Sequence, residues 1–256
     1  MNNIFDTHAH YDDEAFLEDR EEVLGLLTTK GVSHVITCGT DLMSSYRSLK
    51  LAQQYDYIYA ALGFHPEDIG EERKGDLDVI KDLLASEPKA VAVGEIGLDY
   101  HYEDGAPKED QIDLFRRQIE IANELDLPVI VHDRDAHEDT FNIIKELRPR
   151  GVIHCFSGSK EMALEYVKLG MYIGVGGVVT FKNARKAVEV VEALPIEKIL
   201  LETDCPYMAP TPHRGERNDS SLISFVAEKV GEIKNLTPQE VCDITNQNAK
   251  ILFNIK

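Results

Sequence analysis

The sequence lacks several features that would assign it to a class directly. No apolar run approaches the ~20 residues that a membrane span requires, so we expect no membrane protein. The amino terminus has no basic segment followed by an apolar one, and we expect no secretory signal. The four cysteines have no paired spacing, which is typical of reduced thiols and favours a cytoplasmic protein. No repeat or interdomain linker is visible, so we predict one domain over residues 1–256.

Basic residues are also scarce. The chain has 27 Lys and Arg against 46 Asp and Glu, for a formal net charge of −19. This charge disfavours broad electrostatic binding to nucleic acid or to an anionic membrane. A locally basic or metal-containing site would still allow either partner, because the ions add positive charge that the formal count omits.

Eight short β-rich segments alternate with segments of helical periodicity. The expected strands are Ile4–His10, His34–Gly39, Tyr57–His65, Ala90–Leu98, Leu127–His132, Gly151–Phe156, Tyr172–Gly177 and Lys198–Asp204. The expected helices are Asp13–Lys30, Leu42–Tyr55, Leu77–Ser86, Lys108–Leu125, Glu138–Leu147, Lys160–Leu169 and Ala184–Leu194, with two more at the end. This alternation predicts an α/β fold, and eight units favour a (β/α)8 TIM barrel. The alternative is a doubly wound sheet, which the missing Gly-rich phosphate loop after the first strand disfavours.

Histidine is scarce, with nine in the chain, yet four, at positions 8, 10, 132 and 154, lie at or near strand ends where ligands would converge. Active sites of such barrels form at these carboxyl ends. The first two histidines are two residues apart on a strand, so both face the same way. The side chains expected to converge are His8, His10, Glu95, His132, His154 and Asp204. A lone His-x-His pair could simply face solvent, but six donors suit two ions that share a carboxylate.

The chain resembles the TatD family of metal-dependent deoxyribonucleases, within the amidohydrolase-like hydrolases, over nearly its whole length. The motifs that carry the resemblance are Asp6-Thr7-His8-Ala9-His10, Gly63-Phe64-His65-Pro66, Gly94-Glu95-Ile96-Gly97-Leu98-Asp99-Tyr100, Val131-His132-Asp133-Arg134, His154-Cys155-Phe156-Ser157-Gly158, Leu201-Glu202-Thr203-Asp204-Cys205-Pro206 and the stretch Asn246–Phe253. They are specific for the family and the fold, and much less specific for the substrate.

The resemblance implies two divalent cations per chain. The mixed histidine and carboxylate set suits Zn²⁺, Mn²⁺ or similar ions, and Mg²⁺ less well. The residues implied to hold one ion are His8, His10 and Asp204, and those implied to hold the other are His132 and His154. Glu95 is implied to bridge both ions, where many relatives in the wider superfamily use a carboxylated lysine, which disfavours hydrolysis of cyclic amides.

The catalytic set implied by the resemblance is Glu95, Asp204 and His65. Asp204 could accept a proton from water, or it could be a ligand alone. His65 is implied to lie near the scissile phosphate, where a protonated imidazole would donate to an oxygen, although a buried wall histidine is the alternative. We predict that Arg134 binds substrate. Asp99 and Arg134 lie just past ligand positions and could each support a ligand or contact substrate, or they could form a surface ion pair.

Other polar residues remain without a firm role. Glu202 could orient a metal-binding imidazole or fill the barrel interior. The histidines to which we assign no role are His34, His101, His137 and His213. Covalent catalysis by Cys155 or Ser157 is disfavoured, because no Gly-x-Ser-x-Gly motif accompanies them.

The first functional hypothesis is a 3′–5′ exonuclease that cleaves phosphodiester bonds at single-stranded DNA ends with metal-activated water. The loops expected at the site carry both signs of charge, which predicts weak binding along the nucleic-acid strand and distributive cutting. The alternative is hydrolysis of a small ester, amide or phosphorylated metabolite by the same site. A third possibility is a metal-binding scaffold without catalysis. We expect no membrane partner, and a monomer rather than an obligate oligomer.

Overall fold

A computed structural model describes residues 1–70 and 75–256, and its eight parallel strands pair in the order β1 to β8. The strands are β1 (Ile4–Ala9), β2 (Val32–Cys38), β3 (Ile58–Leu62), β4 (Ala90–Asp99), β5 (Val129–Arg134), β6 (Gly151–Ile153), β7 (Tyr172–Val175) and β8 (Ile199–Leu201). Just beyond the end of β8, the amide of Asp204 donates to the carbonyl of His8 at 2.9 Å, and the amide of His10 donates to the carbonyl of Cys205 at 2.7 Å. The last strand therefore returns beside the first, and the predicted barrel is confirmed.

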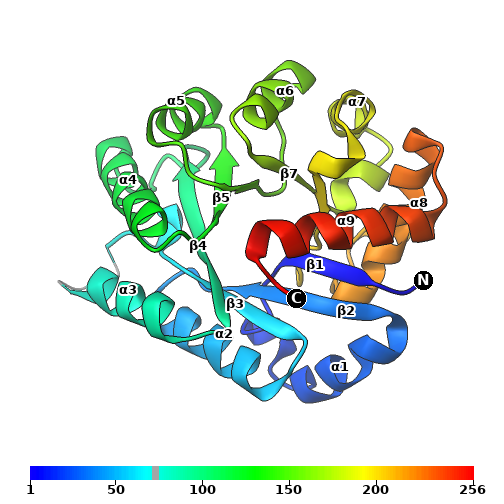
Figure 1. Ribbon diagram of the computed structural model, residues 1–256, viewed down its shortest axis with the longest axis horizontal. Coiled ribbons are helices and arrows are strands. Elements are labelled where there is room, and N and C mark those ends of the chain that lie inside the picture. The colour runs from blue at the N-terminus through cyan, green and yellow to red at the C-terminus, as the bar shows by residue number, and fades with distance from the viewer. Residues whose placement is uncertain (71–74) are drawn as a thin grey trace.

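The helices surround the strands as an outer ring, and the last helix lies across one end of the barrel (Figure 1). They are α1 (Arg20–Leu27), α2 (Leu42–Gln54), α3 (Asp76–Ser86), α4 (Lys108–Glu124), α5 (His137–Leu147), α6 (Lys160–Lys168), α7 (Arg185–Ala193), α8 (Ile223–Lys234) and α9 (Pro238–Phe253). The short 3-10 turns are η1 (Glu14–Phe16), η2 (Thr28–Lys30), η3 (Pro66–Asp68), η4 (Gly177–Thr180), η5 (Ile196–Lys198) and η6 (Ser220–Leu222). None of the helices within the described ranges combines the length and apolarity needed to cross a membrane.

One apolar cluster receives side chains from all eight strands, so it is the interior of the barrel. Its members include Phe5, Ile36, Ala61, Ala92, Ile130, Val152, Tyr172 and Leu200, together with Leu252 and Phe253 of α9. α9 begins with a capping box, in which the Thr237 side chain accepts from the Glu240 amide and the Glu240 carboxylate accepts from the Thr237 amide. This helix closes the amino-terminal end of the barrel and leaves the opposite end for a site.

Several predicted boundaries were wrong by a few residues. The helix expected over Asp13–Lys30 is interrupted, because the Asp13 carboxylate accepts from the Ala15 amide at 2.7 Å and starts the separate turn η1. Strand β6 ends before His154, and strand β8 ends before Asp204. At both places the backbone leaves the hydrogen-bonding pattern of the sheet. Cys155 and Asp204 adopt positive φ angles of 42° and 59°. The chain therefore turns at both places, at the mouth of the barrel.

Candidate metal centre

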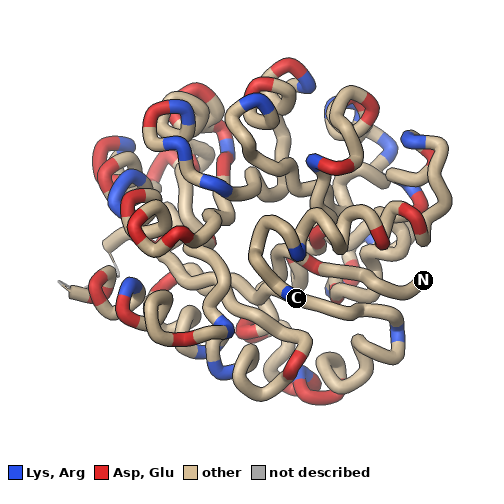
Figure 2. Tube along the Cα trace, in the orientation of Figure 1, with Lys and Arg blue, Asp and Glu red and all other residues tan. Residues whose placement is uncertain are grey.

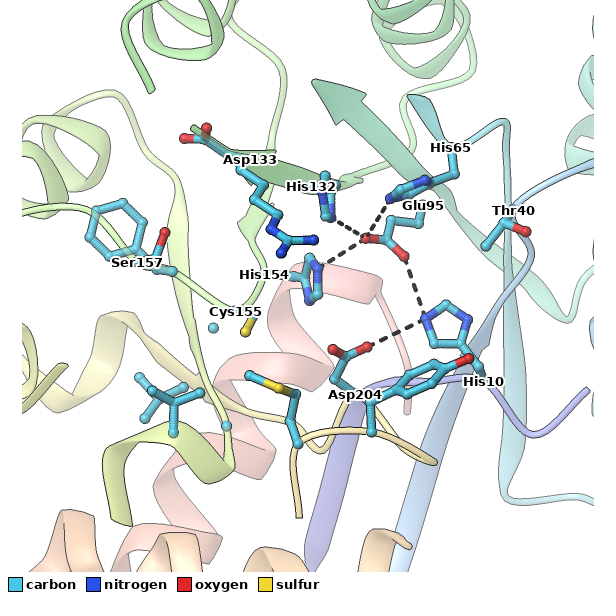
Figure 3. A pocket seen from close by; sticks show the side chains of 18 of the residues that line it. His10, Thr40, His65, Glu95, His132, Asp133, His154, Cys155, Ser157 and Asp204 are labelled. Carbon is cyan, nitrogen blue, oxygen red and sulfur yellow. Dashed lines mark hydrogen bonds and ion pairs between the residues drawn. The ribbon is translucent and has the colours of Figure 1, made fainter. Parts of the chain in front are cut away.

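The six side chains predicted as ligands lie together at the mouth of the barrel. Figure 3 shows five of them, from β1, β4, β5 and the segments after β6 and β8, around one point of the cavity. They are His10, Glu95, His132, His154 and Asp204, and the sixth, His8, contacts Glu95 and Asp204 from β1. Segments almost 200 residues apart in sequence thus supply one group of nitrogen and oxygen donors.

The first donor set has the dimensions of a tetrahedral cage. Nε2 of His8 and Nε2 of His10 lie 3.0 Å apart. Glu95 Oε2 lies 3.2 and 3.4 Å from these two nitrogens, and Asp204 Oδ1 lies 3.7 and 3.5 Å from them. An ion bound at about 2.1 Å separates four tetrahedral ligand atoms by about 3.4 Å. The five observed distances scatter around that value, so these atoms could hold one divalent ion with small shifts.

The other oxygen of Glu95 faces a second donor set. Oε1 lies 2.9 Å from His132 Nδ1 and 2.9 Å from His154 Nε2, with His65 Nε2 at 3.6 Å. Burial opposes ionisation of Glu95, but the neighbouring imidazoles, His154 and His8 foremost, hold its pKa well below the usual range. Glu95 therefore presents one anionic oxygen to each set, which is the arrangement of a bridging carboxylate.

The second ring nitrogen of three of these histidines faces an acceptor, which fixes the nitrogen left for an ion. His10 Nδ1 lies 3.0 Å from the carbonyl oxygen of Cys38, and His8 Nδ1 lies 3.5 Å from its thiol. His132 Nε2 lies 2.9 Å from Asp99 Oδ2. The nitrogens that remain are Nε2 of His8, Nε2 of His10 and Nδ1 of His132, and all three point at the donor sets.

His154 differs from the others because its Nδ1 has no hydrogen-bond partner among the described residues. The nearest acceptor is Oε1 of Glu202 at 3.7 Å, and the second oxygen of Glu202 is also unpartnered within the same part of the chain. Burial raises the pKa of Glu202 to about 7. A Cβ at Gly174 would lie 2.4 Å from Glu202 Oε2, so only glycine leaves room for this carboxylate. These facing atoms favour the predicted orienting role of Glu202.

His65 lies beside the nitrogen and oxygen atoms of the two donor sets, but its ring is oriented to donate a hydrogen bond. Its Nδ1 accepts from the amide of Glu67 at 3.2 Å, so the hydrogen of the neutral ring is on Nε2, which points toward Glu95. Burial lowers the pKa of His65 to about 3, against the raising effect of Glu95. This contact and the lowered pKa favour a neutral ring that donates through Nε2, in place of the protonated imidazole expected from the sequence.

The register between β4 and β5 places Asp99 against His132. Gly97 pairs with His132 and Asp99 pairs with Arg134. Gly97 has φ of 152°, and a Cβ there would lie 1.9 Å from the carbonyl oxygen of His132, so only glycine allows this approach. Burial opposes the charged ring, but hydrogen bonds to Asp99 and Glu95 raise the pKa of His132 to about 10. Asp99 thus orients a candidate ligand and does not form the alternative surface ion pair.

Arg134 lines the cavity, as its predicted role requires. Its Nη1 donates to the Tyr102 hydroxyl at 3.1 Å, and its guanidinium lies 5.1 Å from the centre of the Tyr102 ring. This arrangement leaves other guanidinium donors for a ligand.

The histidines without an assigned role lie outside the donor sets. Their partners are Asp135 for His101, Asp133 for His137 and Glu216 for His213, whereas His34 stacks on Phe5 at the closed end of the barrel. Cys155 lines the cavity, but burial raises the pKa of its thiol well above the usual value, which disfavours a nucleophilic role.

Asp6 opens the first motif, although the sequence alone indicates no role for it. Its buried carboxylate accepts from the amide of Thr203 at 3.0 Å, from the Thr203 hydroxyl at 2.6 Å and from the Ser220 hydroxyl at 2.6 Å. It also accepts from the amide of His8 at 3.3 Å. Asp6 therefore joins the strand that bears His8 to the segment that bears Asp204. In the sequence, the signal for this role is a single acidic residue within a mainly apolar strand.

We expect Asp99→Asn to weaken metal binding by about 10- to 100-fold, the usual effect of removing the carboxylate partner of a metal-binding histidine. An amide supplies a weaker, uncharged acceptor for His132 Nε2. Metal content after dialysis against a graded series of chelator concentrations measures the change. Asp135→Asn is the matched control, because it removes a carboxylate paired with His101 at 2.8 Å on the exposed rim. Equal affinities in the two variants would contradict the orienting role of Asp99.

Comparison with known proteins agrees with this geometry. Residues 5–254 match the sequence model of a family described as TatD related DNase. The chain is 46% identical to the uncharacterized metal-dependent hydrolase YabD of Bacillus subtilis over 98% of this chain and 99% of that protein. It is 33% identical to the 3′-5′ ssDNA/RNA exonuclease TatD of Salmonella typhimurium, with coverage of 98% and 99%. The crystal structure of the TatD homologue YjjV from Escherichia coli superposes with a TM-score of 0.93 at 35% identity, covering 99% of both chains.

Proposed function

Because the chain belongs to the TatD-related family of metal-dependent hydrolases, we propose that it is a nuclease that shortens single-stranded nucleic acid from its 3′ end with two divalent cations. The observation that carries the proposal is the placement of Glu95, whose two oxygens face two separate sets of donors. A relative of 33% identity is named as an exonuclease on single-stranded DNA and RNA, which supports this substrate class.

Two divalent cations held by these sets would supply Lewis acidity and lower the pKa of a water molecule to about neutrality. The protein contributes the orientation of the donors, since the second ring nitrogens of His8, His10 and His132 face fixed acceptors. His65 is the remaining imidazole, and it has an N–H group available for substrate.

Asp204 is the group placed to accept the proton of the attacking water. Its side chain is 21% exposed, more than any other member of the donor sets, so part of the carboxylate faces the cavity. Burial opposes its ionisation, but a hydrogen bond from His10 keeps its pKa below the usual value. The carboxylate is therefore ionised near neutral pH and can take up a proton.

His65 and Arg134 would then bind the non-bridging oxygens of the scissile phosphate. The neutral ring of His65 donates through Nε2, and Arg134 donates through its guanidinium from β5. Both side chains line the cavity beside the donor sets. They would stabilise charge that builds up on the phosphoryl oxygens.

We expect His65→Leu to lower kcat by about 10²-fold, because the loss of one donor to a developing oxyanion has effects of this size. The variant should keep its full metal content, because the hydrogen bond from the Glu67 amide to His65 Nδ1 favours a hydrogen on Nε2, the atom that His65 would use to join Glu95 and His132 as a ligand. Steady-state rates and metal analysis of the same preparation measure both quantities. A variant that loses metal together with activity would instead make His65 a ligand.

A substrate panel tests the proposed function. Metal-loaded protein is incubated with end-labelled single-stranded DNA and RNA, a generic phosphodiester and cyclic amides, with and without chelator. We expect chelator-sensitive shortening of the nucleic acids from the 3′ end. Turnover of the amides alone, or turnover that is insensitive to chelator, would overturn the proposal.

A further inference from the structure

The cavity over the metal centre has one wall that the metal centre does not use. The cavity has a volume of about 1450 Å³. Among its lining residues between Ile173 and Val190, the only charged side chains are Arg185 and Lys186. Beside these two lie the apolar lining residues Val178 and Val179 of η4 and Ala184, Ala187 and Val190 in and beside α7. We call these seven residues the α7 wall.

The α7 wall combines an apolar recess with a basic edge. Val179 and Val190 are almost fully buried, so the apolar surface open to the cavity comes mainly from the part-exposed Val178 and Ala187. Arg185 and Lys186 are exposed at the start of the helix. A group that binds here would place a flat apolar part in the recess and an anion at the edge.

The other walls of the cavity are acidic. The acids that line them outside the donor sets are Asp12, Asp13, Glu14, Glu67, Asp68, Asp133 and Asp135. Three arginines also line these walls. Arg47 lies 3.1 Å from the Asp12 carboxylate, and Arg20 donates to the carbonyls of Asp12 and Asp13 at 3.0 Å, whereas Arg134 lies beside the metal centre, where we propose that it binds the scissile phosphate. The negative charge of these walls disfavours a polyanion there and favours its binding at the α7 wall. This separation of charge is local to the cavity, because acidic and basic residues are interspersed over the molecule as a whole (Figure 2).

Both cations of the α7 wall are available to a ligand. Lys186 forms no ion pair within residues 1–70 and 75–256, and the pair of Arg185 with Glu189 is on the surface, where such pairs are weak. The residue before α7 is Ala184, whose methyl side chain cannot accept a hydrogen bond from the backbone amides of the first turn. The amides of that turn add partial positive charge beside the two side chains.

We propose that the α7 wall is a nucleotide subsite for the single strand that enters the metal centre. The phosphate next to the scissile one binds Arg185 and Lys186, and the base attached to it packs on the apolar recess. A base has an apolar face whatever its identity, so the subsite is independent of sequence. The inference rests on the proposed nuclease function and gives the strand a direction, from the metal centre toward α7.

The test compares two substrates in the double variant Arg185→Ala/Lys186→Ala. We expect kcat/KM for a ten-nucleotide single strand to fall about tenfold more than kcat/KM for bis(p-nitrophenyl) phosphate, which has no second phosphate to bind Arg185 and Lys186. Because the variant removes the cations that neutralise one phosphate, the slope of log affinity against log salt should decrease in magnitude by about 0.7 for a single strand. Ala187→Leu, which narrows the recess, should weaken oligonucleotide binding and leave the salt slope unchanged.

The matched control is Arg116→Ala/Arg117→Ala, an adjacent basic pair on α4 that does not line the cavity and in which Arg116 pairs with Glu146. The proposal of a subsite would be overturned if the two double variants lowered kcat/KM equally. It would also be overturned if the Arg185→Ala/Lys186→Ala variant lost kcat/KM equally with both substrates. If the wild-type protein cleaves neither substrate, the proposed function fails separately. The salt slope for binding of the same oligonucleotide, followed by fluorescence anisotropy, then decides whether the α7 wall binds a single strand.

Discussion

Glu95→Gln is expected to lower turnover by about 10³-fold or more, as is found when one member of a group of residues that act together is removed. Glutamine has one oxygen and one amide nitrogen, so one of the two donor sets would face an N–H group in place of an anion. The donors affected are either His8 and His10 or His132 and His154. Metal analysis should show the loss of metal from the variant, with turnover measured on the same sample.

Glu67→Gln provides the control, because Glu67 lines the same cavity and lies outside both donor sets. It removes one negative charge from the same cavity, so any effect of net charge alone appears in both variants. Full metal content with near-normal turnover in Glu95→Gln would show that this carboxylate does not bridge.

The second large effect is expected for Asp204→Asn, with a loss of about 10²- to 10⁴-fold in kcat, the usual contribution of a general base. The amide cannot accept the proton of the water, although its oxygen could still face His8 and His10. The rate is measured over a metal titration until it no longer rises. A base role predicts that the deficit persists at saturating metal.

A role as ligand alone predicts the opposite for Asp204. Added metal would then restore near-normal turnover, because the weakened site fills at high concentration. The pH profile gives a second criterion, since the pKa of Asp204 lies below its usual value in the wild-type protein. The acidic limb of the rate profile that reports this group should disappear in Asp204→Asn.

The eight strands and their ligands follow from sequence for a physical reason. Strands buried on both faces are apolar along their length, so a polar side chain at a strand end stands out. His8, Glu95, His132 and Asp204 are such polar side chains, although Glu95 lies within β4 and Asp204 lies just beyond β8, and the parallel order β1 to β8 brings all four to one end of the barrel.

The roles of the neighbouring groups depend on three-dimensional register and could not be read from the chain. The orientation of His132 requires that β4 place Asp99 beside β5, which Gly97 permits. The donor orientation of His65 depends on one backbone amide, that of Glu67. Asp6 gains its role only where the segment after β8 returns beside β1.

The distribution of charge around the cavity also could not be predicted from the sequence. Counting charges in the loops predicted a rim of mixed sign, and both signs do line the cavity. In space the acids gather on the walls beside β1, β3 and β5, whereas Arg185 and Lys186 are alone on the α7 wall. The separation appears only once the strands are arranged in a ring.

Anomalous X-ray diffraction from crystals grown with Mn²⁺ or Zn²⁺ shows directly whether Glu95 bridges two ions. We expect two peaks per chain on opposite sides of the Glu95 carboxylate, one among His8, His10 and Asp204 and one beside His132 and His154. A single peak at saturating metal, or peaks only at rim pairs such as His137 with Asp133, would contradict it.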